Sequence, residues 1–292
     1  MDARLGTVAV VGTGIMGAPI ARNLASAGFE VRVWNRSRAK AEALDDVAAV
    51  AASPLEAAQA ADFVVTLLAD ADAIKTVVEG EDGALAAMNG RSAWLQMSTV
   101  GVEATERFRR LASERGIPFV DAPVLGTKLP AEQGQLVVLA SGLEEERDRC
   151  WPVFEALGHR IMWLGEAGAG TRLKLVLNTW LLALIEGLGE AVALAESLGV
   201  DAHRFLEAIE GGPLGPAYAH VKGEMMIERR FPPSFPLRLA HKDARLVLEA
   251  AEESGARLAA LEAAAEQLSR AIEAGHGEDD MAAAVYASLA GG

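Results

Sequence analysis

Three glycines near the start of the chain have the spacing of a phosphate-binding turn. The chain reads Gly12-Thr13-Gly14-Ile15-Met16-Gly17, a G-x-G-x-x-G pattern, between an apolar run at Thr7–Val11 and an alanine-rich segment at Ala18–Ala27. In such a turn the first glycine allows a tight bend, the second lets backbone approach a pyrophosphate, and the third lets a helix pack closely on a strand. The helix N-terminus then attracts the phosphates. We therefore expect these six residues to bind a dinucleotide, with a purely structural glycine turn as the alternative.

The next apolar run ends without the acidic residue that binds the ribose in many NAD sites. The chain reads Asn35-Arg36-Ser37 at this point, and Arg38 and Lys40 follow. Asn35 can hydrogen-bond the ribose or its phosphate, and the planar guanidinium of Arg36 can contact a 2′-phosphate through several donors. This pattern favours NADP over NAD; a solvated, positively charged loop is the alternative.

A lysine and an asparagine stand four residues apart within the most hydrophobic stretch, Leu173–Ala195. The spacing places Lys174 and Asn178 on one face of a helix. Because burial of an isolated ammonium group is costly, Lys174 needs a partner or a cleft. It could donate a proton to a carbonyl oxygen as hydride arrives, with Asn178 orienting it. A lysine that extends into solvent at a domain boundary is the alternative.

The elements that must position these residues fall into two groups. The first half of the chain alternates short apolar runs with helical segments, which is typical of a parallel sheet covered on both faces. Strands are expected at Thr7–Val11, Glu30–Trp34, Phe63–Leu68, Ala93–Gln96, Pro118–Asp121 and Leu136–Ala140. After about Gly170 only helices are expected, at Thr171–Ser197, Asp201–Glu210, Pro216–Glu228, Leu237–Ser254 and Arg257–Ala274, with a short one near Met281–Leu289. We predict a doubly wound α/β domain at residues 1–167 and an all-α domain at residues 168–292, joined by a long interdomain helix.

Composition restricts the classes of partner. The 292 residues are 51% hydrophobic and 23% charged, as in a globular protein. The net charge of −14 disfavours nucleic acid and membrane surfaces as partners. The apolar stretch around Lys174 also carries Glu186 and Glu190, so we expect it to lie in protein and not in lipid. The N-terminus lacks a signal-peptide pattern and Cys150 is the one cysteine, which fits a cytoplasmic protein.

Six motifs occur in the order found in the β-hydroxyacid dehydrogenase family, which the whole chain resembles. They are Gly12–Gly17, Asn35-Arg36, Ser98-Thr99-Val100, Asp121-Ala122-Pro123-Val124, the pair Lys174 and Asn178, and Lys242-Asp243. The segments Thr127–Leu136 and Phe231–Leu237 look most like the glyoxylate and succinic semialdehyde reductase branch. The resemblance implies a Rossmann-type N-terminal domain, as in 3-hydroxyisobutyrate dehydrogenase. It also implies a reductase that uses NADPH to convert a small aldehyde or keto acid into a hydroxy acid.

The resemblance also implies roles for single residues. Lys174 would be the general acid/base and Asn178 its orienting neighbour. Substrate contacts would come from Thr99, Leu125, Gly126, Thr127 and Asp243. Cofactor contacts beyond the glycine turn would come from Asn35, Arg36, Ser37, Leu68, Ala69, Thr99 and Lys242. No metal is expected, because the five histidines lack metal-ligand spacing.

One position departs from the family pattern. Where the family usually has Val-Ser-Gly, this chain reads Val124-Leu125-Gly126. Leu125 cannot donate a side-chain hydrogen bond to a substrate carboxylate, although the backbone N–H groups of Leu125, Gly126 and Thr127 remain. We therefore expect a substrate that is bulkier or less polar than glyoxylate. Trp180 could also fill the substrate pocket, but it is expected to be a core residue or a dimer contact.

Two other functions remain open, and the helical half suggests self-association. Imine reduction on the same scaffold is one alternative: Lys174 argues against it because an iminium ion disfavours a nearby ammonium group, whereas Leu125 and Trp180 argue for it. A non-catalytic NADPH-binding module is the other.

The long apolar faces of the helical half favour a homodimer or homotetramer.

Overall fold

The computed structural model describes residues 5–289. The chain divides into two compact units, Met1–Lys174 and Leu175–Gly292. The division falls inside the long helix that the sequence predicts to join the domains, and each unit is described separately below.

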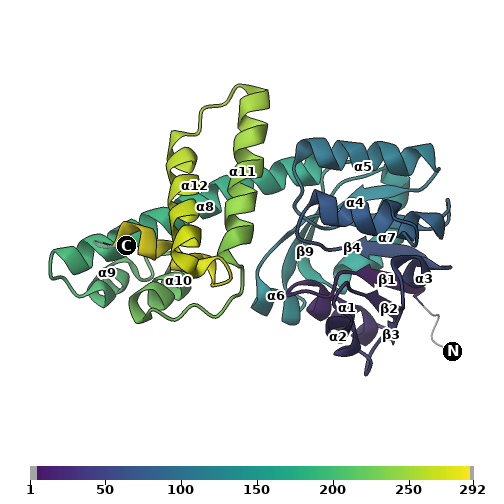
Figure 1. Ribbon diagram of the computed structural model, residues 1–292, viewed down its shortest axis with the longest axis horizontal. Helices are drawn as coiled ribbons and strands as arrows, with labels where there is room; N and C mark the ends of the chain where they lie inside the picture. Colours follow the sequence, from purple (N-terminus) through teal and green to yellow (C-terminus); the bar gives the residue numbers. More distant parts are fainter. Residues whose placement is uncertain (1–4, 290–292) are drawn as a thin grey trace. The chain divides into compact units, whose positions relative to one another are not determined.

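A six-stranded parallel sheet forms the centre of the N-terminal unit (Figure 1). Its spatial order is β3-β2-β1-β4-β5-β6, the order of a dinucleotide-binding fold. The strands are β1 (Thr7–Val11), β2 (Glu30–Trp34), β3 (Ala49–Val50), β4 (Phe63–Thr66), β5 (Ala93–Gln96) and β6 (Phe119–Asp121). The predicted doubly wound parallel sheet is therefore confirmed. The loops after β1 and β4 leave the same edge of the sheet at the point where the strand order reverses.

Both faces of this sheet are covered, because alternate strand residues enter two different cores. Val8 and Val10 of β1 belong to one apolar cluster, and Ala9 and Val11 belong to the other. The first cluster includes α1 (Gly17–Ser26), α7 (Glu144–Glu155) and residues at the ends of α2 (Arg38–Glu42). The second includes α3 (Pro54–Ala58), α4 (Ala71–Glu79), the 3-10 turn Ala84–Ala86 and α5 (Val102–Glu114).

A smaller sheet, which the sequence did not predict, follows the large one. It consists of β7 (Val124–Leu125), β8 (Leu136–Ala140) and β9 (Gly158–Trp163), with α6 (Lys128–Glu132) between β7 and β8. The assignment of Leu136–Ala140 to the parallel sheet was wrong, because β8 pairs antiparallel with β7 and parallel with β9. The large sheet ends at Asp121, whose N–H and C=O groups exchange hydrogen bonds with Ser141.

The C-terminal unit contains helices and no strand among its described residues, as predicted. Its helices are α8, which spans Ala169–Ser197 and begins in the N-terminal unit, α9 (Ala202–Ile209), α10 (Ala217–Glu228), α11 (Leu237–Ser254) and α12 (Ala259–Ala271). A π-helical turn (Ile272–His276) and a 3-10 helix (Met281–Ser288) follow. A buried ion pair of 2.5 Å joins Lys222 of α10 to Asp280, and Asp280 also accepts hydrogen bonds from the N–H groups of Ser234 and Phe235. These bonds fix the segment that leads into α11.

Cys150, the one cysteine of the chain, is buried on α7. Burial raises the pKa of its thiol to about 12, so it carries no activated thiolate. The cytoplasmic location that the cysteine usage favours stays a prediction.

Helix α8 combines a buried polar face with exposed apolar side chains. By length and composition alone it could cross a membrane, and 39% of its most apolar window is buried inside the protein. Trp180 is 68% exposed, so the interpretation of Trp180 as a core residue was wrong. Val176, Leu194 and Leu198 of the same segment are also exposed.

Glu186 of α8 is a buried carboxyl group that the sequence analysis did not single out for chemistry. Burial raises its pKa to about 8, with a further contribution from Glu190, and its Oε1 atom has no hydrogen-bond partner among residues 5–289. Glu186 is therefore protonated in the folded protein at neutral pH, whereas in the unfolded chain it ionises near its ordinary pKa of about 4.3.

This difference predicts that the free energy of unfolding falls as pH rises between about 4.5 and 8, because the folded state holds a proton that the unfolded state has lost. Glu186→Gln cannot ionise and should therefore be more stable than the wild type at pH 9. The expected difference in the free energy of unfolding is a few kcal/mol, because each unit by which folding raises the pKa corresponds to about 1.4 kcal/mol. The two proteins should differ little at pH 5. Urea unfolding at the two pH values measures this, with Glu253→Gln, at an exposed glutamate of α11, as control. Parallel pH dependences for Glu186→Gln and wild type would contradict the assignment.

Candidate active site

The turn after β1 has the close backbone contacts that its glycines predict. Gly12 has φ +106°, and a Cβ atom there would lie 2.4 Å from the carbonyl oxygen of Leu67. A Cβ atom on Gly17 would lie 1.8 Å from the carbonyl oxygen of Gly12. Only glycine fits at these two positions, because a side chain on Gly12 would collide with the backbone that follows β4, and one on Gly17 would push α1 away from the turn after β1.

The middle of the same turn is open. A Cβ atom on Gly14 would meet no atom within 4 Å. Thr13 Oγ1 is buried and has no hydrogen-bond partner among the described residues. An open glycine backbone, an unsatisfied hydroxyl and a helix N-terminus fit the diphosphate of a nicotinamide dinucleotide.

Asn35 ties the glycine turn to the end of β2. Its Oδ1 accepts a hydrogen bond from Thr13 N at 3.1 Å, and its Nδ2 donates to the carbonyl oxygen of Ser37 at 3.0 Å. The next residue, Arg36, is exposed and forms no hydrogen bond or ion pair with any described residue. Arg38 is bound to Glu42 at 2.7 Å. Of these two arginines, only Arg36 keeps its guanidinium available for a ligand.

The ends of β4 and β5 are joined by buried polar contacts. Gln96 donates from Nε2 to the carbonyl oxygen of Ser98 and accepts from Ser98 N, at 2.8 and 2.7 Å. Ser98 Oγ accepts from Leu68 N at 2.8 Å. The bond between Leu68 and Ser98 thus joins two adjacent loops, one with Leu68 and Ala69 and the other with Thr99. Leu68 also lies against Gly12. Sequence reasoning missed Gln96; the available signal was an amide at the end of an otherwise apolar strand.

The segment Leu125–Thr127 turns sharply after β7. Gly126 has φ +132°, and a Cβ atom there would lie 2.7 Å from a methyl group of Leu136. The backbone N–H groups of Gly126 and Thr127 donate no hydrogen bond within residues 5–289. Two backbone donors thus follow Leu125, which offers none from its side chain.

Asp121 anchors the beginning of α8. Its two carboxylate oxygens accept hydrogen bonds of 2.7 Å from Thr171 N and Thr171 Oγ1. Burial raises the pKa of Asp121 to about 6, although the hydrogen bonds from Thr171 and Ser141 oppose this rise. The sequence analysis placed Asp121 in a family motif but did not find this contact.

Lys174 lies on α8, one turn after Thr171, and is 8% exposed. This burial does not fit a lysine extended into solvent. Asn178 follows one helical turn later and is 1% exposed. The predicted pair therefore lies on a buried face of α8.

In the C-terminal unit, Asn178 is held by α11. Its Nδ2 donates to Asp243 Oδ2 at 2.8 Å, and Lys242 Nζ lies 2.9 Å from Asp243 Oδ1. Asn178 Oδ1 is buried and has no hydrogen-bond partner in the described part of the chain. The structure thus joins Asn178 to Asp243, two residues that the sequence named for different roles.

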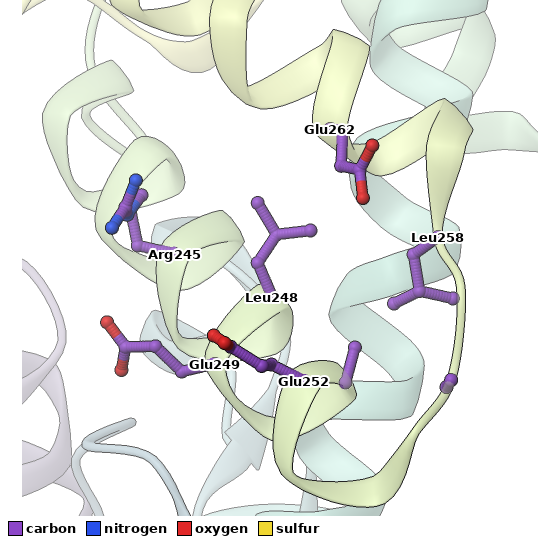
Figure 2. A pocket seen from close by; sticks show the side chains of 8 residues that line it. Arg245, Leu248, Glu249, Glu252, Leu258 and Glu262 are labelled. Carbon is purple, nitrogen blue, oxygen red and sulfur yellow. The ribbon is translucent and has the colours of Figure 1, made fainter.

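A pocket of about 410 Å³ elsewhere in the C-terminal unit contains none of the predicted site residues (Figure 2). It lies between α11 and α12 and is lined by Arg245, Leu248, Glu249, Ala251, Glu252, Ala256, Leu258 and Glu262. Figure 2 shows its carboxylates on both helices. Residues 5–289 also contain no group of three or more His, Cys, Asp or Glu side chains placed to hold a metal.

Comparison with known proteins identifies the families of both halves. Residues 7–165 match the NAD binding domain of 6-phosphogluconate dehydrogenase. Residues 168–288 match the NAD-binding family of NADP-dependent 3-hydroxyisobutyrate dehydrogenase.

Similar proteins align over nearly the whole chain. Oxidoreductase YfjR of Bacillus subtilis is 36% identical, over 95% of this chain and 98% of its own. Glyoxylate/succinic semialdehyde reductase 1 of Arabidopsis thaliana is 32% identical, over 96% of this chain and 97% of its own. The structure of 3-hydroxyisobutyrate dehydrogenase from Mycobacterium tuberculosis with L-serine has 28% identity and a TM-score of 0.86, over 98% and 99%. An imine reductase from Myxococcus stipitatus, at 21% identity and a TM-score of 0.68, shares the fold.

The glycine turn at the reversal point of the parallel sheet fits a nicotinamide dinucleotide, and the relatives of this chain are named as reductases and dehydrogenases. The protein is therefore an NAD(P)-dependent oxidoreductase that acts on CH–OH and C=O groups. The chain belongs to the β-hydroxyacid dehydrogenase family, in which its relatives are 3-hydroxyisobutyrate dehydrogenase-like proteins and glyoxylate/succinic semialdehyde reductases.

Proposed function

We propose that the protein is an NADPH-dependent reductase that converts a small aldehyde or keto acid into the corresponding hydroxy acid, with Lys174 as the proton donor. The observation that carries this proposal is the burial of Lys174 one turn before a fully buried Asn178 on α8. Two polar side chains on a buried helix face need a functional or structural reason, because their desolvation is costly.

Lys174 and Asn178 have separate tasks in this proposal. The bound nicotinamide supplies the hydride. Lys174 holds a proton and donates it to the substrate oxygen, so that no free alkoxide forms. Asn178 orients the ammonium group of Lys174, while Asp243 fixes the Asn178 amide through the 2.8 Å hydrogen bond. The unsatisfied Oδ1 of Asn178 supports this role, since it is a buried acceptor that an ammonium or hydroxyl group would satisfy.

Preference for NADP over NAD is proposed from Arg36. Its side chain is exposed beside the glycine turn and has no partner among the described residues, and the end of β2 carries no acid to bind a ribose 2′-hydroxyl. A guanidinium group offers a 2′-phosphate two parallel hydrogen bonds. The assignments of Ser37, Leu68, Ala69, Thr99 and Lys242 to the cofactor also belong to this proposal.

For the substrate, we propose a short-chain carbonyl compound with a carboxylate or similar anionic group and a moderately apolar body. The free N–H groups of Gly126 and Thr127 offer donors for the anion, and Leu125 offers an apolar surface. Thr99 and Asp243 complete the proposed substrate contacts. Relatives named for glyoxylate, succinic semialdehyde and 3-sulfolactaldehyde all act on small aldehydes that carry an acidic group.

Self-association through α8 is part of the proposal. Val176, Trp180 and Leu194 of α8, and Leu198 directly after it, are between 59% and 70% exposed, and the most apolar part of α8 has a mean hydropathy of 1.5. Large apolar side chains gathered along one helix are typical of an interface between protein chains. A second copy of this chain is the proposed partner, giving a homodimer or homotetramer.

Lys174→Ala should lower kcat by about a hundredfold or more, because proton donation is lost, while the Kd for NADPH stays nearly unchanged. NADPH oxidation with glyoxylate, succinic semialdehyde, an apolar aldehyde and a cyclic imine gives the measurement, and fluorescence titration gives the Kd. The exposed Lys75→Ala is the control. Unchanged turnover in Lys174→Ala would exclude Lys174 as the acid. For the wild type, faster turnover of the imine than of the carbonyl compounds would favour imine reduction, and no turnover of any of them would favour a binding module.

Arg36→Ala should weaken NADPH binding by about ten- to a hundredfold, the loss expected when hydrogen bonds to a phosphate are removed, and should leave NADH binding nearly unchanged. Arg38→Ala is the matched control, because Arg38 is already bound to Glu42 and should affect NADPH much less. Equal losses for the two cofactors in Arg36→Ala would contradict the proposed contact.

Leu125→Ser restores the hydroxyl that the family usually has and should raise kcat/KM for glyoxylate by about tenfold, since it adds a donor to the carboxylate. The same change should lower kcat/KM for an apolar aldehyde. A wild-type enzyme that already prefers glyoxylate strongly over bulkier carbonyl compounds would refute this interpretation of Leu125.

Trp180→Glu should convert the proposed oligomer into smaller species, because it places a charge within an apolar interface. Light scattering coupled to size exclusion measures the molar mass. Leu143→Glu, at an exposed leucine of the N-terminal unit, is the control and should leave the mass unchanged. A monomeric wild-type protein would overturn the proposed interface.

A further inference from the structure

Asp121 lies where three elements of the N-terminal unit meet. It is the last residue of β6 and pairs with Gln96 of β5 in the large sheet. Its backbone exchanges two hydrogen bonds with Ser141, which follows β8. Three residues further on, the chain enters β7 and the segment that carries Leu125. Asp121 therefore links the edge of the sheet that carries the cofactor turn to the proposed substrate-binding segment.

The side chain of Asp121 adds α8 to this junction. Its carboxylate oxygens accept from Thr171 N and Thr171 Oγ1, both at 2.7 Å. Ser141 Oγ accepts from Gly170 N at 2.9 Å and so holds the preceding residue of the helix. A Cβ atom on Gly170 would lie 2.1 Å from the carbonyl oxygen of Leu139, which shows how closely the helix start approaches β8.

Lys174 is three residues beyond Thr171 on the same continuous helix. At about 1.5 Å per residue, its backbone lies roughly 4.5 Å along the helix axis from the anchored position. An α-helix is stiff over one turn, so the position of Thr171 sets the position from which the Lys174 side chain extends.

We propose that Asp121 is a positioning residue for the reaction: its carboxyl group fixes the first turn of α8, and thereby the place of Lys174 relative to the loops that carry Thr99 and Leu125. The inference rests on the proposed role of Lys174 as proton donor. Asp121 itself touches neither cofactor nor substrate in this arrangement; it acts through Thr171.

The hydrogen-bond pattern around Thr171 shows which substitution preserves the anchor. Thr105 Oγ1 lies 3.1 Å from Thr171 Oγ1 and donates to the carbonyl oxygen of Gly101 at 2.8 Å. In Asp121→Asn, the amide oxygen can accept from Thr171 N, and the amide nitrogen can donate to Thr171 Oγ1, which then donates to Thr105. Asparagine thus satisfies the same atoms, whereas alanine leaves the buried N–H of Thr171 without an acceptor.

The test compares Asp121→Ala with Asp121→Asn in steady-state NADPH oxidation. We expect Asp121→Ala to lower kcat by about ten- to a hundredfold, as displacement of a catalytic group by about 1 Å does, and Asp121→Asn to retain kcat within about threefold. The Kd for NADPH should be unchanged in both. Ser92→Ala is the matched control: Ser92 Oγ is a buried donor to the carbonyl oxygen of Ala61 in the same unit. It should lower the Tm and leave kcat unchanged.

A double mutant separates positioning from general destabilisation. If Asp121 acts through Lys174, Asp121→Ala should lower kcat much less in a Lys174→Ala background than in the wild type. Equal losses in both backgrounds, or a folded Asp121→Ala with wild-type kcat while Lys174→Ala is impaired, would overturn the inference. Should Asp121→Ala fail to fold, Thr171→Val removes one of the two anchoring bonds, and wild-type kcat in that variant would overturn it equally. Failure of the proposed function itself is recognised separately, by unchanged turnover in Lys174→Ala.

Discussion

Polar side chains at the carboxyl ends of the parallel strands, two of them buried, hold the loops of the candidate site in the N-terminal unit. Asn35 after β2, Gln96 at the end of β5 and Asp121 at the end of β6 each bind backbone groups of a neighbouring loop or helix. Without these side chains, the backbone N–H and C=O groups that they bind would lack a hydrogen-bond partner where the sheet ends. A buried polar group without a partner lowers the stability of the fold by about 1–3 kcal/mol. The loops are therefore fixed before any ligand binds.

Backbone groups, and not side chains, form much of the surface proposed to bind cofactor and substrate. The glycine turn is open at Gly14, and the segment after Leu125 presents two unused N–H groups. Side chains are excluded at Gly12 by the backbone that follows β4, and at Gly17 by the closeness of the start of α1 to Gly12. In the proposed function, the chemical selectivity of the site would depend on the side chains around this backbone, among them Arg36 and Leu125.

The large sheet could be predicted from the sequence because its signals are local. β1, β2 and β5 begin and end where the apolar runs do, and the glycine turn lies directly after β1. The small sheet could not be predicted from the sequence. β7 has only two residues, and the partners of β8 are set by the tertiary fold and not by the local sequence. The Asp121 anchor joins residues 50 apart in sequence, and no local pattern reports such a contact. Trp180 is a second example of a property that no local pattern reports: the side chain is apolar, yet it is exposed.

The chemistry of Cys150 has a practical consequence for solution studies. The chain has a single thiol, and it is both enclosed by α7 and its neighbours and kept in the neutral form far above physiological pH. Alkylating dyes react with thiolates, so the native protein is close to inert toward them. A cysteine introduced on each unit would then take up a fluorophore selectively, and energy transfer between two such dyes would report the separation of the units in solution without removal of the natural residue.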